Sequence, residues 1–199
     1  MIGFHGCDAD LAYAVINGQA SLRPSINKYD WLGHGIYFWE RSPSRALQFA
    51  TELQQNSKRA VRPIITPAVV GALLDLGKCL DLTDYEHLRH VQDSYLLFSK
   101  IVEHDGAVMP RNHTFNESND LLLRELDCAV LEFFFLLNDL NGNEHYDSIR
   151  SPFIEGEELY PTAGFREKTH IQICIRDAGC IKAYFKPLNA EFIQMYSMS

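Results

Sequence analysis

The sequence of 199 residues has no excess of basic residues, no long hydrophobic run and no closely spaced cysteine pair. It contains 18 Lys and Arg against 26 Asp and Glu, which gives a formal net charge of −8. This negative charge disfavours binding to a long nucleic acid duplex. The most apolar stretch, 131–137, is interrupted by Glu132 and is far shorter than the ~20 apolar residues that span a bilayer. No basic segment followed by an apolar run opens the chain, so we expect a cytoplasmic protein that makes no membrane contact.

Several common site signatures are also missing. Neither the G-x-G-x-x-G nor the G-x-x-x-x-G-K-[ST] nucleotide-binding fingerprint occurs. The five cysteines form no C-x-x-C pair, which favours reduced, mostly buried thiols over disulfides or a zinc site. His87 and His90 have no evident third ligand, so we expect no metal.

What is present is the composition of a globular protein, with 46% hydrophobic residues and no repeat or linker-like tract. We therefore expect one domain over residues 1–199. Helices are predicted after Asp8 or Asp10, after Ser42-Pro43, after Thr83 in a capping box with Glu86, and over 119–140. Strands are predicted at the first residues, at 33–39, 69–74, 146–153, 170–176 and 181–186, with a turn at 177–179 joining the last two. This mixed order favours an α+β fold with a mainly antiparallel sheet.

Four short motifs carry most of the functional information. In chain order they are Phe4-His5-Gly6, Leu22-Arg23, Gly35-Ile36-Tyr37-Phe38 and Gln172-Ile173-Cys174-Ile175-Arg176-Asp177. Taken together, they resemble the ADP-ribosyltransferase fold in its diphtheria-toxin and poly-ADP-ribose-polymerase branch, which carries a His, a Tyr and a Glu on three separate strands. The resemblance covers residues 1–50 and about 165–187.

The resemblance implies a split, mainly antiparallel sheet with flanking helices, in which residues 83–145 form a helical insertion. The implied activity is that of an NAD-dependent mono-ADP-ribosyltransferase, a glycosyltransferase that cleaves the nicotinamide–ribose bond and transfers one ADP-ribose to a macromolecular acceptor. NAD is then a co-substrate and no metal is needed. Small stand-alone members are often bacterial toxins or phage-related effectors, which implies a neutralising antitoxin partner. The acidic charge favours a protein acceptor over a nucleic acid.

The resemblance also assigns roles to residues near the N-terminus. His5 would hydrogen-bond the adenosine ribose, Gly6 would pair its backbone with the nicotinamide carboxamide, and Tyr37 would stack on the nicotinamide ring. Arg23 would reach the adenosine side or a phosphate, and Phe49 would replace a second stacking tyrosine. Four of these assignments have a plainer alternative: a structural histidine for His5, a glycine for a tight strand exit for Gly6, a core aromatic residue for Tyr37 and a surface arginine for Arg23.

Gln172 departs from the family pattern, because it stands where the catalytic glutamate is expected. An amide can hydrogen-bond the ribose, but it carries no charge for the oxocarbenium-like centre and cannot act as a general base. Four other carboxylates could fold over the site: Glu155, Glu157, Glu158 and Glu167. Glu167, on the acceptor side, has the opposite strand parity to Gln172, whereas His170 shares the face of Gln172. We take His170 as an acceptor-side candidate, with an exposed strand histidine as its alternative.

Three functions follow from these residues and stay open. The leading one is a mono-ADP-ribosyltransferase in which Tyr37, Gln172 and His5 serve the reaction. A second is a non-catalytic module that binds NAD or ADP-ribose, which the neutral Gln172 favours. A third is an NAD glycohydrolase that uses water as the acceptor.

Overall fold

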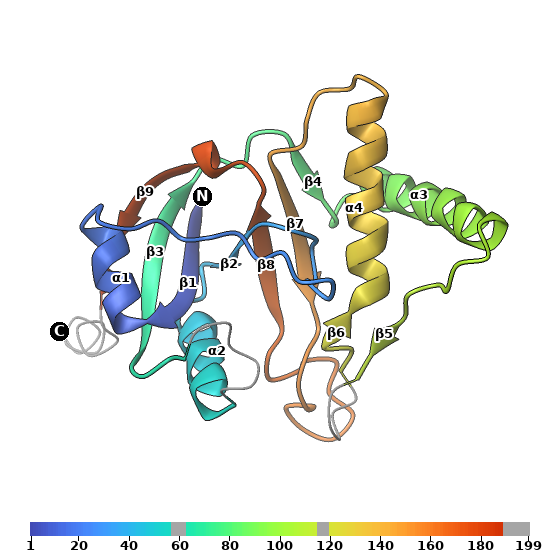
Figure 1. Ribbon diagram of the computed structural model, residues 1–199. Helices are drawn as coiled ribbons and strands as arrows, with labels where there is room; N and C mark the ends of the chain where they lie inside the picture. Colours follow the sequence, from blue (N-terminus) through green and yellow to red (C-terminus); the bar gives the residue numbers. More distant parts are fainter. Residues whose placement is uncertain (57–62, 115–119, 189–199) are drawn as a thin grey trace. The chain divides into compact units, whose positions relative to one another are not determined.

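The computed structural model describes residues 1–56, 63–114 and 120–188 (Figure 1). The chain divides into two compact units. The first unit comprises Met1–Leu22, Phe38–Leu74 and Ile181–Ser199, and the second comprises Arg23–Tyr37 and Asp75–Cys180. The predicted insertion at 83–145 falls wholly within the second unit, and its role as an insertion into one domain stays a prediction.

The first unit contains four antiparallel strands in the order β2-β1-β3-β9. Their bounds are Ile2–Asp8 for β1, Ile36–Glu40 for β2, Pro67–Leu74 for β3 and Ile181–Phe185 for β9. Strand β1 pairs with β3 along its whole length, from Ile2 opposite Leu73 to Asp8 opposite Pro67. The first two residues of β2 belong to the second unit.

Two helices pack on these strands, α1 (Ala9–Ile16) and α2 (Pro43–Gln55) (Figure 1). Helix α1 begins after Asp8, whose side chain accepts a hydrogen bond from the backbone N–H of Asp10 at 3.0 Å. Helix α2 begins after Ser42, with Pro43 in its first turn. The starts predicted for both helices are therefore confirmed.

Ser42→Ala should destabilise the protein by about 1 kcal/mol, because the Ser42 hydroxyl accepts the hydrogen bond of an otherwise unpaired N–H at the start of α2. The bond comes from the backbone N–H of Arg45 at 3.4 Å. Urea denaturation measures the effect. Ser44→Ala, at an exposed position in the same turn, is the control and should change stability by a few tenths of a kcal/mol; equal losses in both variants would contradict the cap.

The second unit contains three neighbouring strands in the order β4-β7-β8. Their bounds are Cys79–Asp81 for β4, Ser148–Phe153 for β7 and His170–Ile175 for β8. Strands β7 and β8 are antiparallel, whereas β4 and β7 are parallel. The predicted turn at 177–179 lies between β8 and β9, where the backbone N–H of Cys180 donates to the carbonyl of Asp177 at 3.0 Å, but β8 pairs with β7 and β9 pairs with β3. The short 3-10 helix η2 (Ala178–Cys180) connects them.

The helical part of this unit consists of α3 (Tyr85–His104) and α4 (Glu125–Leu140), with a small hairpin of β5 (Asn112–His113) and β6 (Leu123–Arg124) before α4. Helix α3 is capped by Asp84 rather than by Thr83, so its predicted start is wrong by one residue. The carboxylate of Asp84 accepts from two backbone N–H groups. Helix α4 begins later than predicted, and Asn119 lies outside the described residues.

The core of the second unit lies between α4 and one face of β4, β7 and β8 (Figure 1). Leu80, Ile149 and Cys174 from the three strands are fully buried in it. Phe134 and Phe135 of α4 belong to the same cluster, and their rings contact each other edge to face. Burying such side chains stabilises the fold by about 1.5–3 kcal/mol each.

Helices and mostly antiparallel strands thus occur in both units, which confirms the α+β class. Four of the five cysteines are buried, as expected, and none of the five is in a disulfide. Among the described residues, no helix is both long and apolar enough to cross a membrane.

Candidate functional site

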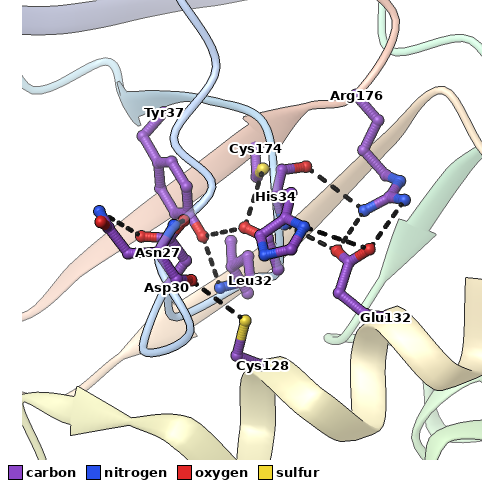
Figure 2. A network of polar contacts seen from close by, with 10 residues as sticks. Asn27, Asp30, Leu32, His34, Tyr37, Cys128, Glu132, Cys174 and Arg176 are labelled. Atoms are coloured by element: carbon purple, nitrogen blue, oxygen red, sulfur yellow. Dashed lines mark hydrogen bonds and ion pairs between the residues drawn. The ribbon is translucent and has the colours of Figure 1, made fainter.

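Tyr37 of β2 has its hydroxyl fixed by the loop that precedes the strand (Figure 2). The hydroxyl donates a hydrogen bond to the carbonyl of Gly33 at 2.6 Å and accepts one from the backbone N–H of Leu32 at 2.8 Å. Burial raises the pKa of Tyr37 well above its usual value, so the phenol stays neutral. The ring packs against the core cluster yet remains partly exposed. Tyr37 can therefore offer a fixed aromatic surface, but not a proton acceptor.

The loop that precedes β2 is tied together by the buried Asp30 (Figure 2). Its carboxylate accepts hydrogen bonds from the Ser25 hydroxyl at 2.8 Å and from the backbone N–H of Asn27 at 2.9 Å. Burial raises the pKa of Asp30, and these hydrogen bonds oppose the rise. The Cys128 thiol of α4 donates to the Asn27 carbonyl at 3.5 Å, which anchors the loop to the helix.

A second anchor joins the loop, α4 and the end of β8 through Glu132 (Figure 2). The Glu132 Oε1 atom accepts from Arg176 Nη1 at 2.7 Å and from the backbone N–H of His34 at 2.7 Å. The Arg176 guanidinium lies 3.8 Å from the centroid of the Phe135 ring. Gly33 has a φ of +73°, and a Cβ there would stand 2.4 Å from Oε1. This position therefore requires glycine.

Gln172 lies within β8, directly opposite Ser151 of β7. It is 8% exposed, and its amide oxygen Oε1 has no hydrogen-bond partner among the residues that the structure describes. An unpaired buried acceptor costs about 1–3 kcal/mol, which a ligand that donates a hydrogen bond would recover. Cys174 shares the strand face of Gln172 and belongs to the core cluster against which Tyr37 packs. Gln172 and Tyr37 are thereby brought to the same side of the second unit.

His170 shares this face as well, but its side chain is only 1% exposed, so the alternative of an exposed strand histidine is wrong. Its Nδ1 atom lies 2.5 Å from the carbonyl oxygen of Lys168 and 3.8 Å from Glu155 Oε2. Its ring stacks on Trp31 with the centroids 6.3 Å apart. The acceptor-side role that the sequence suggests would require His170 to act from a closed, aromatic environment.

The four carboxylates that could compensate for the neutral Gln172 differ in burial. Glu155 is 6% exposed and lies beside His170. Glu157, Glu158 and Glu167 are exposed. Glu167 lies in the loop ahead of β8, where its N–H donates to the carbonyl of Glu157 at 3.0 Å. Glu155 is therefore the carboxylate that the fold keeps next to the candidate site.

His5 and Gly6 belong to the first unit and have clear structural contacts there. The His5 ring meets the Phe38 ring edge to face, with the centroids 5.9 Å apart. A Cβ at Gly6 would stand 2.0 Å from the carbonyl oxygen of Ala46 in α2. Gly6 is thus required for the close packing of α2 on β1, which supplies a structural reason for the glycine, and its pairing with nicotinamide stays a prediction.

Phe49 has a structural contact in the first unit, and Arg23 fits its alternative of a surface arginine. The Phe49 ring packs against Trp39, with the centroids 4.8 Å apart. Arg23 is exposed at the start of the second unit. The roles of both residues toward NAD stay predictions.

A cavity of about 280 Å³ in the second unit went unpredicted. Its walls come from the loop before β2 and from α3, β6, α4 and β7, and include Trp31, Val91, Tyr95, Arg124, Ser151 and Phe153. The Arg124 guanidinium lies 4.5 Å from the centroid of Trp31 and 4.8 Å from that of Phe153. No spacing rule links these positions, but the aromatic residues Tyr29 and Trp31, two positions apart in a loop, are a signal in the sequence that could have indicated an aromatic site.

The described residues contain no group of three or more His, Cys, Asp or Glu side chains placed to hold a metal ion. His87 instead places Nδ1 3.0 Å from the carbonyl oxygen of Asp81. The Tyr37 ring, the Gln172 amide and the aromatic side chains of the cavity are suited to hydrogen bonding and stacking on an organic ligand.

Comparisons with known proteins give one distant relative. An archaeal protein, "Uncharacterized protein MJ0359" of Methanocaldococcus jannaschii, is 26% identical over 200 residues, which cover 90% of this chain and 83% of that protein. No family model matches the chain, and no solved structure matches it. The similarity therefore extends over most of the length of both proteins and includes residues of both units.

Proposed function

We propose that the protein is an NAD-dependent mono-ADP-ribosyltransferase. The observation that carries this proposal is the buried amide of Gln172, whose Oε1 atom has no hydrogen-bond donor among the described residues. Gln172 lies on β8, and the resemblance aligns it with the family's glutamate. A buried acceptor without a partner is costly in a purely structural role and useful against a ribose hydroxyl.

The residues of the second unit divide the work between them. Tyr37 offers its ring to the nicotinamide, and its hydroxyl bonds to Leu32 and Gly33 hold the ring in place. Gln172 accepts a hydrogen bond from the ribose beside the bond that breaks. The Glu155 carboxylate, near His170, is the negative charge available to the oxocarbenium-like ribose. Nicotinamide leaves with the bonding electrons, and the acceptor attacks the ribose carbon and loses its proton.

His5 and Gly6 enter the proposal through the resemblance alone. Their contacts in the first unit fix the backbone of β1 against α2 and β3. A toxin or effector role and an antitoxin partner belong to the same proposal, and so does a macromolecular acceptor.

Gln172→Glu tests the proposal most directly. The new carboxylate should raise nicotinamide release from NAD roughly tenfold or more, because a positioned general base contributes ~10²–10⁴-fold. Gln172→Ala should lower it. The assay incubates each protein with labelled NAD and a cell lysate, and measures free nicotinamide and labelled macromolecules.

Gln19→Glu is the matched control, since it makes the same chemical change at an exposed position and should leave turnover unchanged. If neither the native protein nor Gln172→Glu releases nicotinamide at high protein concentration, the proposal is wrong. Nicotinamide release without any labelled macromolecule would instead indicate a glycohydrolase.

A non-catalytic module that binds NAD or ADP-ribose is the second candidate, because Gln172 carries no charge. Calorimetry distinguishes it from the enzyme. Saturable NAD binding in the native protein, with no nicotinamide released by it or by Gln172→Glu, would support the module.

A further inference from the structure

We propose that the cavity of the second unit is a binding site for a nucleobase, presented by a nucleoside or nucleotide. The inference goes beyond the proposed function, because the cavity is walled by α3, α4 and β7 and contains none of the residues that the family resemblance assigns to NAD. It also does not need the chain to be an enzyme.

The size of the cavity selects a single ring system. Its volume is about 280 Å³, at the lower end of the ~300–1,000 Å³ that is typical of small-molecule sites. A purine or pyrimidine with part of its ribose matches such a volume. A whole dinucleotide is too large, so only one base of NAD could enter.

The walls favour a flat, electron-poor ligand. Trp31 and Phe153 line one side, with the Trp31 and Phe153 rings 4.8 Å apart at an angle of 62°. Tyr95 of α3 lines the opening and is 40% exposed. Stacking of one base on an aromatic side chain contributes about 1–3 kcal/mol.

The aromatic walls are held rigidly. The indole N–H of Trp31 donates to the carbonyl of Leu122 at 2.9 Å, and the Trp31 ring stacks on the buried His170. Arg124 lies against the Trp31 ring and pairs with Asp127 through Nη1 at 3.2 Å. A fixed surface binds a ring with little loss of side-chain entropy.

The polar groups around the cavity match the edge of a base. Arg124, Asp127, Gln92 and Ser151 line it, and together they offer both donors and acceptors.

The combination of aromatic walls and polar side chains favours a nucleobase over a purely apolar ring or a free phosphate. A phenylalanine side chain would leave the polar groups unpaired, and a free phosphate would gain nothing from the aromatic walls. The acidic net charge of −8 opposes a long polynucleotide, but it does not oppose the ring of a nucleoside.

Calorimetry with the native protein tests the inference, using adenosine, guanosine, cytidine, uridine and NAD as separate ligands and ribose 5-phosphate as the ring-free control. We expect saturable binding of at least one nucleoside and none of ribose 5-phosphate. Binding of adenosine as well as NAD would assign the adenine of NAD to the cavity. Binding of another nucleoside without adenosine would indicate a separate substrate. If no nucleoside binds, the inference is overturned, whether or not NAD binds.

Val91→Phe locates the site, because the larger ring fills the cavity from α3. Nucleoside affinity should fall at least tenfold. Leu88→Phe, at a position that is 47% exposed on the same helix, is the matched control and should bind as the native protein does. Equal affinity in Val91→Phe and the native protein, with the melting temperature of Val91→Phe intact, would contradict the location.

Trp39→Phe gives a second readout, because Trp31 then remains as the only one of the two tryptophans. Its fluorescence should be quenched saturably by the nucleoside that calorimetry identifies. Nicotinamide release is measured on the same samples. If Trp39→Phe and the native protein release nicotinamide but bind no nucleoside, this inference is overturned and the proposed function stands.

Discussion

Glu132→Ala is expected to destabilise the protein by about 1.5–3 kcal/mol, the range for hydrogen bonds to charged groups, because the ion pair it removes is only partly buried. Glu132 and Arg176 are 27% and 14% exposed, and their Oε1 and Nη1 atoms are 2.7 Å apart. The change leaves the Arg176 guanidinium without its carboxylate and the N–H of His34 without its acceptor. Denaturation in urea at pH 7 measures the loss.

The pH dependence of this effect has a defined sign. Burial raises the pKa of Glu132, but the hydrogen bonds from Arg176 and from the His34 N–H outweigh it and place the pKa below 4.5. A carboxyl with a lowered pKa stabilises the folded state above its unfolded value of about 4.5, and this contribution is lost as the pH falls through the folded value. The difference in unfolding free energy between the native protein and Glu132→Gln should be constant well above pH 4.5. It should shrink as the pH falls from 4.5 through the lower pKa of Glu132 in the folded state.

Glu125→Gln is the control for the same substitution in the same helix. Glu125 pairs with Lys28 at 2.8 Å, but the Lys28 side chain is 76% exposed. Exposed pairs contribute about 0.2–1 kcal/mol, so this variant should lose little stability. If Glu125→Gln and Glu132→Gln are equally destabilising at pH 7, Glu132 does not anchor the loop before β2.

The elements that local chemistry determines could be predicted from the sequence. Helix α2 follows from Ser42-Pro43, because a hydroxyl cap and a proline in the first turn both favour a helix start. At α3 the same reasoning missed by one residue, since Thr83 and Asp84 are both capable caps. The Asp84 carboxylate reaches two backbone N–H groups, which decides between them.

Pairings between distant strands could not be predicted in the same way. The turn at 177–179 has the residues of a hairpin, yet β8 pairs with β7. The backbone N–H groups of Arg176 and Asp177 both donate to the carbonyl of Asp147, so the chain after β8 is held by a residue some 30 positions earlier. Local composition carries no information on such a partner.

The candidate site shows the same division. Tyr37 and Gln172 could be named because short motifs mark them; in the structure Tyr37 packs against the core cluster that contains Cys174, and Gln172 shares a strand face with Cys174. Trp31 and Arg124 could not, because their meeting depends on the packing of a loop against α4. Their neighbourhood becomes visible only when burial and ring contacts are known.

Gly6→Ala is expected to destabilise the protein by about 1–3 kcal/mol, the usual cost of overpacking, and by more if α2 cannot move. The added Cβ would stand 2.0 Å from the carbonyl oxygen of Ala46, which is a backbone atom of α2 and cannot rotate away. It would also lie 3.3 Å from the Cβ of Ala50. Helix α2 would have to shift from β1, and thermal denaturation measures the result.

Two comparisons isolate this clash. Gly164→Ala makes the same change where a Cβ meets nothing within 4 Å, so its stability should stay within about 0.5 kcal/mol of the native protein. Adding Ala46→Gly to Gly6→Ala should not restore stability, because the blocking atom belongs to the backbone rather than to the alanine side chain. If Gly6→Ala keeps full stability and loses nicotinamide release, Gly6 is required for the reaction rather than for packing; if it loses both together, packing of α2 on β1 is the reason that glycine occupies this position.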